Sequence, residues 1–303
     1  MTHRVEGVGV GFRIEMADAL IEREPPEIDW LELHPENYMQ RGGGFTDSLA
    51  RARERWPFAT HGLTMCFGNT APFERSYLDP LRAFLRDLET PWHSDHLCFG
   101  AADGRMAHDL LPLPFTEEAV ANCVQRFTEA RDALDITLAF ENVSYYAPQS
   151  EDGLVEADFV REVLERADGR MLFDVNNLYV NSQNFGFDPL AYIDRIPLER
   201  VVQIHVAGHL IEDEHLRIDT HGEPIGDGVY VLLERVLERT GPVPVLLERD
   251  NNIPPLDVLL DEVRRLRAIY DRATPKATRA TRSTPARGEP VGAAAPVRAG
   301  GRP

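Results

Sequence analysis

The chain has 303 residues, of which 43% are hydrophobic, and its formal net charge at pH 7 is −18. A chain of this length can bury a large core, either as two modest domains or as one α/β barrel, and we expect one domain. The strong acidity argues against nucleic acid as a substrate, because proteins bind duplexes largely through Lys and Arg on the phosphates.

Short apolar strands alternate with amphipathic segments along most of the chain. The predicted strands are 7–12, 30–33, 57–60, 91–94, 136–140, 170–173, 201–204 and 243–247. Between them, apolar residues recur at spacings of three and four, which predicts helices that include 77–88, 117–134, 156–167 and 229–240. Eight strand-then-helix units predict a parallel (β/α)8 TIM barrel, an α/β fold, with a doubly wound open sheet as the alternative.

The composition changes at about Thr274 to Thr, Ala, Pro, Arg and Gly without apolar periodicity. Residues 274–303 carry six basic residues against Glu289 alone, so the part before them is more acidic than the whole chain. Such a segment cannot bury enough surface to offset the entropy lost on ordering. We therefore expect a barrel domain over 1–273 and a disordered Pro/Ala/Arg-rich tail over 274–303.

Two other features bear on location and chemistry. We find no secretory signal pattern and no apolar run of membrane-spanning length, so we expect a soluble, cytoplasmic protein that does not enter a membrane. The three cysteines, Cys66, Cys98 and Cys123, fall in no CxxC spacing. We expect reduced thiols rather than a zinc-thiolate site, and we assign these residues no functional role.

Metal-capable side chains follow seven successive predicted strands, where TIM barrels carry their active sites. Together with the loop after the seventh strand, these positions hold Glu32, His34, His61, Asp95, His96, Glu141, Asn142, Asp174, Asn177, His205, His209, Asp219, His221 and Glu248. Buried carboxylates and imidazoles are costly unless they are paired or bind metal. Because Arg and Lys are nearly absent here, Arg249 being the exception, the pattern predicts a multinuclear metal site.

The stretch DVNNLYVNSQN, residues 174–184, is the most unusual of these strand ends. Asn and Asp favour turns, and we expect a loop there. Asp174 and Asn177 are predicted metal ligands. Asn176 and Asn181 are expected to shape the loop or to support the ligands.

Oxygen and nitrogen ligands without thiolate suit Fe, Mn or Zn. The number of candidate ligands fits two or three ions better than one. Glu141 and Glu248 lie on strands that can face each other across the barrel, so both are candidates for bridging carboxylates.

Seven motifs occur in a fixed order along the chain: HGLTMCFG, SDHLCF, FENVS, DVNNLYVN, IHVAGH, DTHG and LLERD. With them the chain resembles the multinuclear non-haem iron-dependent oxidative enzymes, the family of the methanobactin-maturing oxidase and the bufferin maturases. The resemblance that they make specific runs from about residue 7 to 270. The resemblance implies a barrel like those of xylose isomerase and endonuclease IV. It also implies two to three iron ions, including a mixed-valence Fe(II)/Fe(III) pair, held by His61, His96, Glu141, Asp174, Asn177, His205, Asp219, His221 and Glu248. Asn177 stands where the endonuclease pattern has His, which predicts a weaker ligand at the third site.

By the same resemblance, the substrate is a ribosomally made precursor peptide that is modified, commonly at Cys, with dioxygen as co-substrate. Family members usually act with a separate recognition protein. Asp250 is the candidate catalytic base, and the alternative is an ion pair with the adjacent Arg249. His34 and His209 are candidate substrate-binding residues, although a histidine such as His34 can also be a packed residue at a strand end.

Three other functions fit the same residues. A Zn- or Mn-dependent hydrolase would use the ions to activate water. A sugar isomerase of the same barrel superfamily would need a substrate-positioning Lys, yet Lys276 in the predicted tail is the only Lys in the chain. A non-catalytic metal-binding protein would hold the ions without turnover.

Overall fold

The computed structural model describes residues 4–102, 105–149 and 152–273. The barrel lies in a compact unit that ends at Ala273, and the predicted tail, 274–303, lies outside the described residues. The barrel strands are β1 (Val8–Gly11), β2 (Trp30–Leu33), β3 (Phe58–His61), β4 (His93–His96), β7 (Leu138–Glu141), β8 (Arg170–Asp174), β9 (Val201–Val206) and β12 (Val245–Leu247).

These eight strands pair in parallel in a closed ring, since the last strand, β12, pairs with the first, β1. The predicted (β/α)8 barrel is therefore confirmed, and the open doubly wound sheet is excluded. Five strands start one or two residues later than predicted, namely β1, β3, β4, β7 and β12. Three of them, β3, β4 and β12, follow closely on a proline, Pro57, Pro91 or Pro244, which has no N–H to donate to a strand ladder.

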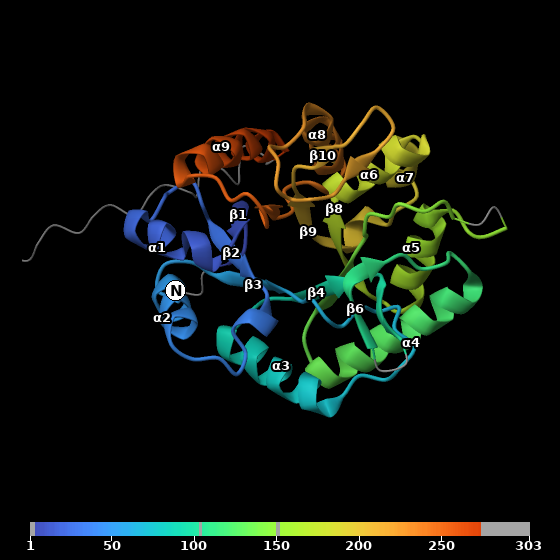
Figure 1. The fold of residues 1–303 in the computed structure, drawn as a ribbon, viewed down its shortest axis with the longest axis horizontal. Coiled ribbons are helices and arrows are strands. Elements are labelled where there is room, and N and C mark those ends of the chain that lie inside the picture. Colours follow the sequence, from blue (N-terminus) through green and yellow to red (C-terminus); the bar gives the residue numbers. More distant parts are fainter. Residues whose placement is uncertain (1–3, 103–104, 150–151, 274–303) are drawn as a thin grey trace, which may run out of the picture. The chain divides into compact units, whose positions relative to one another are not determined.

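The helices are α1 (Ile14–Arg23), α2 (Gly44–Arg53), α3 (Arg75–Leu88), α4 (Glu117–Leu134), α5 (Glu156–Arg166), α6 (Val175–Phe185), α7 (Pro189–Ile193), α8 (Asp227–Thr240) and α9 (Leu256–Ala273), with short 3-10 turns η1 (Pro35–Asn37) and η2 (Leu198–Arg200). They surround the strands (Figure 1). The four helices predicted by residue range are all present. Helix α4 has the predicted bounds because Thr116 caps it, accepting a hydrogen bond from the backbone of Ala119.

The loop predicted over 174–184 is wrong, because these residues form helix α6. Asp174 is the N-cap residue and accepts the backbone N–H of Asn177, and Gly186 ends the helix in the left-handed conformation. Asn is a poor helix former in isolation. Here Asn177 and Asn181 are buried and donate hydrogen bonds to the backbone oxygens of Asn142 and Val143, in the loop after β7, so tertiary contacts outweigh the local preference.

The strand pleat separates two environments. Leu31 and Leu33 belong to the main core, which packs the strands against the helices, whereas Trp30 belongs to a separate small cluster with Ala59 and Leu246. Glu32 alternates with the leucines on the same side of β2 as Trp30 and is fully buried. Alternation thus gives the barrel interior an apolar layer near the strand starts and a polar layer near the strand ends.

Two hairpins extend the loops at the carboxyl ends of the strands, β5 (Phe99–Ala102) with β6 (Arg105–Leu111), and β10 (Leu210–Ile211) with β11 (Arg217–Ile218).

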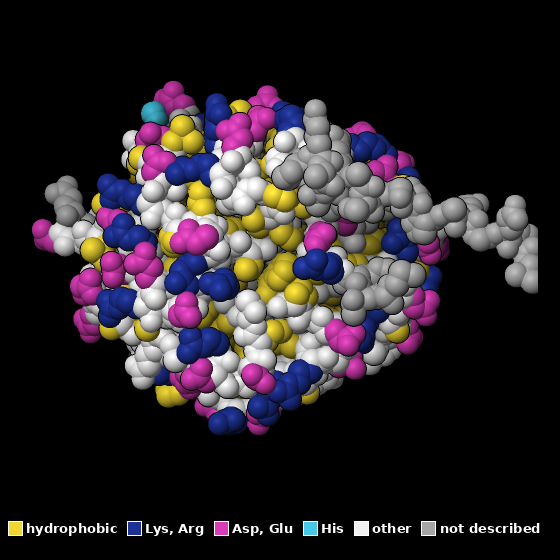
Figure 2. Space-filling model, turned by 180° about the vertical axis from the view of Figure 1, so that it is seen from behind, with side chains coloured by type: hydrophobic (Ala, Val, Ile, Leu, Met, Phe, Trp, Pro, Cys, Tyr) yellow, Lys and Arg dark blue, Asp and Glu magenta, His cyan; other side chains and the backbone are white. Residues whose placement is uncertain are grey.

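On the face of the molecule in Figure 2, basic and acidic side chains are interspersed rather than gathered into one basic area. Among the described residues, no helix is both long and apolar enough to cross a membrane.

Candidate metal centre

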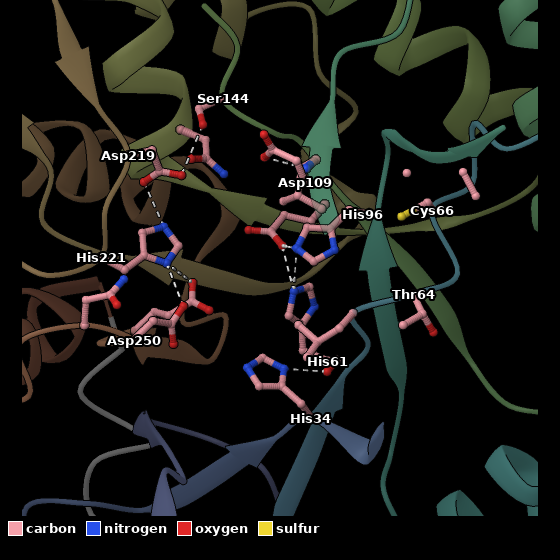
Figure 3. A pocket seen from close by; sticks show the side chains of 18 of the residues that line it. His34, His61, Thr64, Cys66, His96, Asp109, Ser144, Asp219, His221 and Asp250 are labelled. Atoms are coloured by element: carbon pink, nitrogen blue, oxygen red, sulfur yellow. Dashed lines mark hydrogen bonds and ion pairs between the residues drawn. The ribbon is translucent and has the colours of Figure 1, made fainter. Parts of the chain in front are cut away.

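A cavity of about 670 Å³ opens at the carboxyl ends of the barrel strands (Figure 3). The predicted site residues that line it are His34, His61, His96, Glu141, Asn177, Asp219, His221, Glu248 and Asp250. Two further predicted ligands, Asp174 and His205, are fully buried and lie within metal-binding distance of Glu141 and Glu248. The structure therefore brings together all nine predicted ligands, which lie in or directly after the barrel strands from β3 to β12, in helix α6 (Asn177) and in the loop after β9 (Asp219 and His221).

The first ligand group consists of His61, His96 and Glu141, the last residues of β3, β4 and β7. His61 is held through Nδ1 by the Ser94 hydroxyl at 2.9 Å, which points Nε2 to Glu141 Oε2 at 3.0 Å. His96 Nε2 lies 3.4 Å from the same oxygen. Two imidazole nitrogens and a carboxylate oxygen thus converge on one point.

Protons and metal compete at this group. Burial opposes protonation of His96, but the carboxylates of Asp95 and Glu141 raise its pKa to about 9. A divalent cation bound to Glu141 and His96 would use the His96 lone pair that otherwise binds a proton. Metal binding is therefore expected to release protons.

The second group consists of Glu141, Asp174, His205 and Glu248. His205 Nδ1 lies 3.0 Å from Glu248 Oε2 and 3.6 Å from Glu141 Oε1. Burial, followed by repulsion from Glu141 and Asp219, raises the pKa of Asp174 well above its ordinary value. Glu141 belongs to both groups, which is the geometry that a bridging carboxylate requires.

His205 is oriented by a carboxylate inside the barrel. Its Nε2 lies 3.0 and 3.2 Å from the two oxygens of Glu32, which also accepts a hydrogen bond from Gln203. Gln203 in turn accepts from the Trp92 indole at 2.7 Å. A carboxylate on one imidazole nitrogen leaves the other, Nδ1, for a metal and raises its basicity.

The third part of the site comes from the loop after β9. His221 Nε2 lies 2.8 Å from Asp219 Oδ1, and Asn176 donates to that same oxygen at 2.7 Å. Ser144 donates to the other Asp219 oxygen at 3.2 Å. Asn176 therefore positions the predicted ligand Asp219. Asp219 and His221 lie close enough together to bind one metal ion.

Asp174 and Asn177 are each anchored at one end and free at the other. Asp174 Oδ1 accepts the Asn177 backbone N–H at 2.6 Å, and Asn177 Nδ2 donates to the Asn142 carbonyl at 2.9 Å. Asn142 also exchanges two hydrogen bonds with the Asp174 backbone. The remaining oxygens, Asp174 Oδ2 and Asn177 Oδ1, have no hydrogen-bond partner although they are buried.

Buried atoms that make no hydrogen bond are concentrated at this site within the described part of the chain. They include Glu141 Oε2, Asp174 Oδ2, Asn177 Oδ1, His205 Nδ1, His221 Nε2 and Glu248 Oε2. Four of them, Glu141 Oε2, His205 Nδ1, His221 Nε2 and Glu248 Oε2, have only ion-pair contacts with other predicted ligands. Burying such atoms without hydrogen bonds is costly. Because all six belong to predicted ligands and offer only oxygen or nitrogen, the residues fit a multinuclear metal site of the kind that holds Fe, Mn or Zn.

Asp250 does not pair with its neighbour Arg249, which instead binds Glu262. Its partner is Arg13, whose guanidinium contacts Asp250 Oδ1 through both Nε and Nη2, at 2.9 and 2.5 Å. The other oxygen, Oδ2, lies 3.1 Å from His221 Nδ1. Burial and Glu248 oppose ionisation, yet Arg13 and His221 lower the pKa of Asp250 to about 2.

The two histidines predicted to bind substrate differ in position. His34 lines the cavity, and its Nδ1 donates to the His61 carbonyl, which leaves Nε2 unprotonated. Burial, then the charge of Arg13, lowers the pKa of His34 to about 4. His209 is not part of the cavity wall as described and bonds to Asn176 Oδ1 at 2.8 Å, so it supports the side chain that holds Asp219.

Sequence reasoning missed Arg13 and did not give Asp95 or Glu32 its observed role. Asp95 does not line the cavity in the described part of the structure. Its carboxylate accepts the backbone N–H groups of Thr64, Met65, Cys66 and His96 and so shapes the loop after β3. Arg13 lies just after β1, so the strand-end rule, extended to the first strand, would have found it.

The barrel is similar to several solved structures, at sequence identities that show the fold alone. D-psicose 3-epimerase from Clostridium cellulolyticum matches with a TM-score of 0.56 at 11% identity, over 88% of this chain and 98% of that one. A xylose isomerase-like TIM barrel protein from Mycobacterium smegmatis, in complex with magnesium, matches with a TM-score of 0.56 at 10% identity, over 91% and 100%. Endonuclease IV from Thermus thermophilus matches with a TM-score of 0.53 at 14% identity, over 88% and 99%. The expected likeness to xylose isomerase and endonuclease IV is confirmed.

Relatives of similar length are found by sequence. A UPF0276 protein of Nitrosospira multiformis is 43% identical over 260 residues, which is 86% of this chain and 92% of that protein. A UPF0276 protein of Caulobacter vibrioides is 40% identical over 265 residues, covering 88% and 94%. Residues 7–271 also match the family model for the RiPP precursor modification enzymes MbnB/TglH/ChrH, where RiPP denotes a ribosomally synthesised and post-translationally modified peptide. The match spans the barrel and every predicted ligand, and the chain accordingly belongs to the MbnB/TglH/ChrH family of RiPP precursor modification enzymes.

Proposed function

We propose that this protein is a multinuclear iron-dependent oxidase that modifies a precursor peptide, at Cys, with dioxygen as co-substrate. The observation that carries the proposal is Glu141, whose carboxylate is shared between two convergent ligand groups. The family match supports a precursor peptide as substrate. A separate recognition protein is proposed on the resemblance alone.

The proposed ligands divide among the ions by geometry. His61, His96 and Glu141 would hold one iron, and Glu141, Asp174, His205 and Glu248 a second. The pair Asp219 and His221, with Asn177 as a weaker ligand, would hold a third. Iron bound there supplies redox chemistry with dioxygen and has an affinity for the soft thiolate that these protein ligands do not provide.

The remaining residues of the cavity would act on the peptide. Asp250 is proposed as the proton acceptor, because its carboxylate lines the cavity and is ionised. Its pair with Arg13 lowers its basicity, so this role requires that pair to open when the substrate binds. His34 is proposed to contact the substrate as a hydrogen-bond acceptor through its unprotonated Nε2. His209 stays a proposed substrate contact only if the loop after β9 rearranges, since it bonds to Asn176 in this structure.

Metal content tests the cofactor. Protein produced in iron-supplemented cells should carry about two to three Fe per chain, since the ligands outnumber those of one octahedral ion. Elemental analysis measures this directly. One Zn per chain, without iron-dependent activity after reconstitution, would instead favour a hydrolase.

Turnover tests the reaction. With its precursor peptide and recognition protein, the iron-loaded enzyme should consume dioxygen while the peptide loses a few hydrogens or a small fragment in mass. A peptide with Ser in place of the target Cys should not change in mass, because it lacks the sulfur. Normal processing of the Ser peptide would refute oxidation anchored by a thiolate, and metal binding without oxygen consumption would favour sequestration.

A further inference from the structure

A second cavity, of about 590 Å³, adjoins the metal cavity and shares Thr64, Asn69 and Ala101 with it. Hydrogen bonds hold this shared wall in place. Asn69 Oδ1 accepts the backbone N–H groups of Gly100 and Ala101, each at 3.0 Å, and Thr64 donates its hydroxyl to Glu36 at 3.2 Å. An extended peptide that crosses the shared wall would place neighbouring residues in the two cavities.

The second cavity has a wall suited to a long aliphatic stem. Met39, Pro72, Phe73 and Pro80 contribute apolar surface, from the segment after η1, the loop before α3 and α3 itself. Its charged residues are both acidic, Glu36 and Glu74, and no Arg or Lys belongs to the wall in the described part of the chain. The cavity therefore combines apolar surface with negative charge.

Glu36 is fixed by one of its two oxygens. Oε1 accepts the Leu63 backbone N–H at 3.0 Å, the Thr64 hydroxyl and the Tyr77 hydroxyl at 2.8 Å. Oε2 is buried and has no hydrogen-bond partner. A carboxylate held rigidly on one side and unpartnered on the other favours a ligand that brings a donor, above all a cationic one.

We propose that this second cavity binds an Arg or Lys side chain of the precursor peptide, close to the residue that is modified in the metal cavity. The stem packs against Met39 and Phe73, and the cationic end pairs with Glu36. An acidic side chain would be repelled by Glu36 and Glu74, and an apolar one would leave Glu36 Oε2 without a partner. The inference rests on the proposed function for its peptide, but not on any particular reaction.

Binding, measured apart from turnover, tests the inference. The probes are short synthetic peptides that contain Cys and, one to three positions away, Arg or its neutral analogue citrulline. Their affinities for the full-length, iron-loaded protein are measured by calorimetry without oxygen. The Arg peptide should bind about tenfold more tightly than the citrulline peptide, as expected for a charge-assisted hydrogen bond.

Three variants separate charge from shape. Glu36→Gln retains an oxygen for the three internal donors and should reduce the Arg-to-citrulline ratio to about one. Phe73→Ala should weaken both peptides equally and keep the ratio. Glu89→Gln is the control, because Glu89 is exposed and lines a different cavity, at the start of the barrel strands. Its ratio should match that of the unmodified protein.

Equal affinities for the two peptides, no detectable binding at millimolar concentrations, or an unchanged ratio in Glu36→Gln would each overturn the assignment. A preference for the Arg peptide without oxygen consumption in air would support the proposed subsite and contradict the proposed oxidase function. Oxidation of a Cys peptide without a preference for Arg would support the oxidase function and contradict the subsite. The two proposals can therefore fail separately.

Discussion

At the scale of single residues, the site depends on which atom of each side chain is free. Sequence position predicted that His205, Asp174 and Asn177 end strands or follow them. It did not predict that Glu32 takes one nitrogen of His205, or that backbone groups take one end of Asp174 and Asn177. Glu32 and Asn142 come from β2 and from the loop after β7, so only the closed barrel reveals these two partners, whereas Asp174 is held by the local N-cap contact with Asn177.

Removal of a shared ligand should cost more metal than removal of a terminal one. Glu141→Ala or Glu248→Ala is expected to lose more iron than His221→Ala, which should lose roughly one ion. Elemental analysis of the three purified variants under one loading protocol gives the comparison. Equal losses would remove the bridging assignment.

Arg13 should matter for stability through Asp250. Arg13→Gln leaves the Asp250 carboxylate without its main cationic partner, and should cost roughly 1 to 3 kcal/mol, since Asp250 is partly solvated. The double variant Arg13→Gln/Asp250→Asn should recover part of that loss. Denaturant unfolding of the single and double variants measures the coupling, and additive effects would show that the pair is not coupled.

At the scale of elements, the helices and strands that pack against the core were predictable because their apolar spacing decides their structure. Helix α6 was not, because its Asn side chains find their partners in other segments. The hairpins β5–β6 and β10–β11 were also missed, since they lie in long loops outside the alternating pattern. Local sequence thus predicts the barrel strands and the helices that pack on them. Tertiary contacts determine the structure of the segments around the site.

The start of α5 carries a pH-dependent contribution. Glu156 accepts hydrogen bonds from the hydroxyls of Tyr145 and Tyr192, at 3.1 and 3.4 Å, and burial raises its pKa to about 7 although these donors oppose the shift. An unfolded Glu ionises near pH 4.3, so the folded chain holds a proton that the unfolded chain releases between about 4.3 and about 7. The stability contribution of Glu156 therefore falls as pH rises through that interval.

Glu156→Gln removes this ionisation. The free energy of unfolding of the variant should exceed that of the unmodified protein by about 1 kcal/mol above about pH 8 and by little below about pH 4. The gain is limited to this size because Glu156 is not fully excluded from solvent. Unfolding free energies at the two pH values test this. A difference between the proteins that is independent of pH would contradict the raised pKa.

At the scale of the whole molecule, the composition predicts that the basic segment 274–303 lies outside the fold of the acidic barrel. Removing 274–303 should change melting temperature and iron content little, since terminal segments of this composition are usually dispensable. Thermal unfolding and elemental analysis of the shortened chain are the measurements. A large fall in either would mean that the basic segment packs on the acidic barrel.

The closure of the barrel by β12 has a consequence for how the protein is made. Glu248 follows this last strand, and its partners Glu141 and His205 come from earlier ones, so the second ligand group is incomplete until nearly the whole barrel has left the ribosome. The ligands of the first group, His61, His96 and Glu141, leave the ribosome earlier, because they end β3, β4 and β7. Iron delivery to the second group is therefore expected only after synthesis, through the open mouth of the finished barrel.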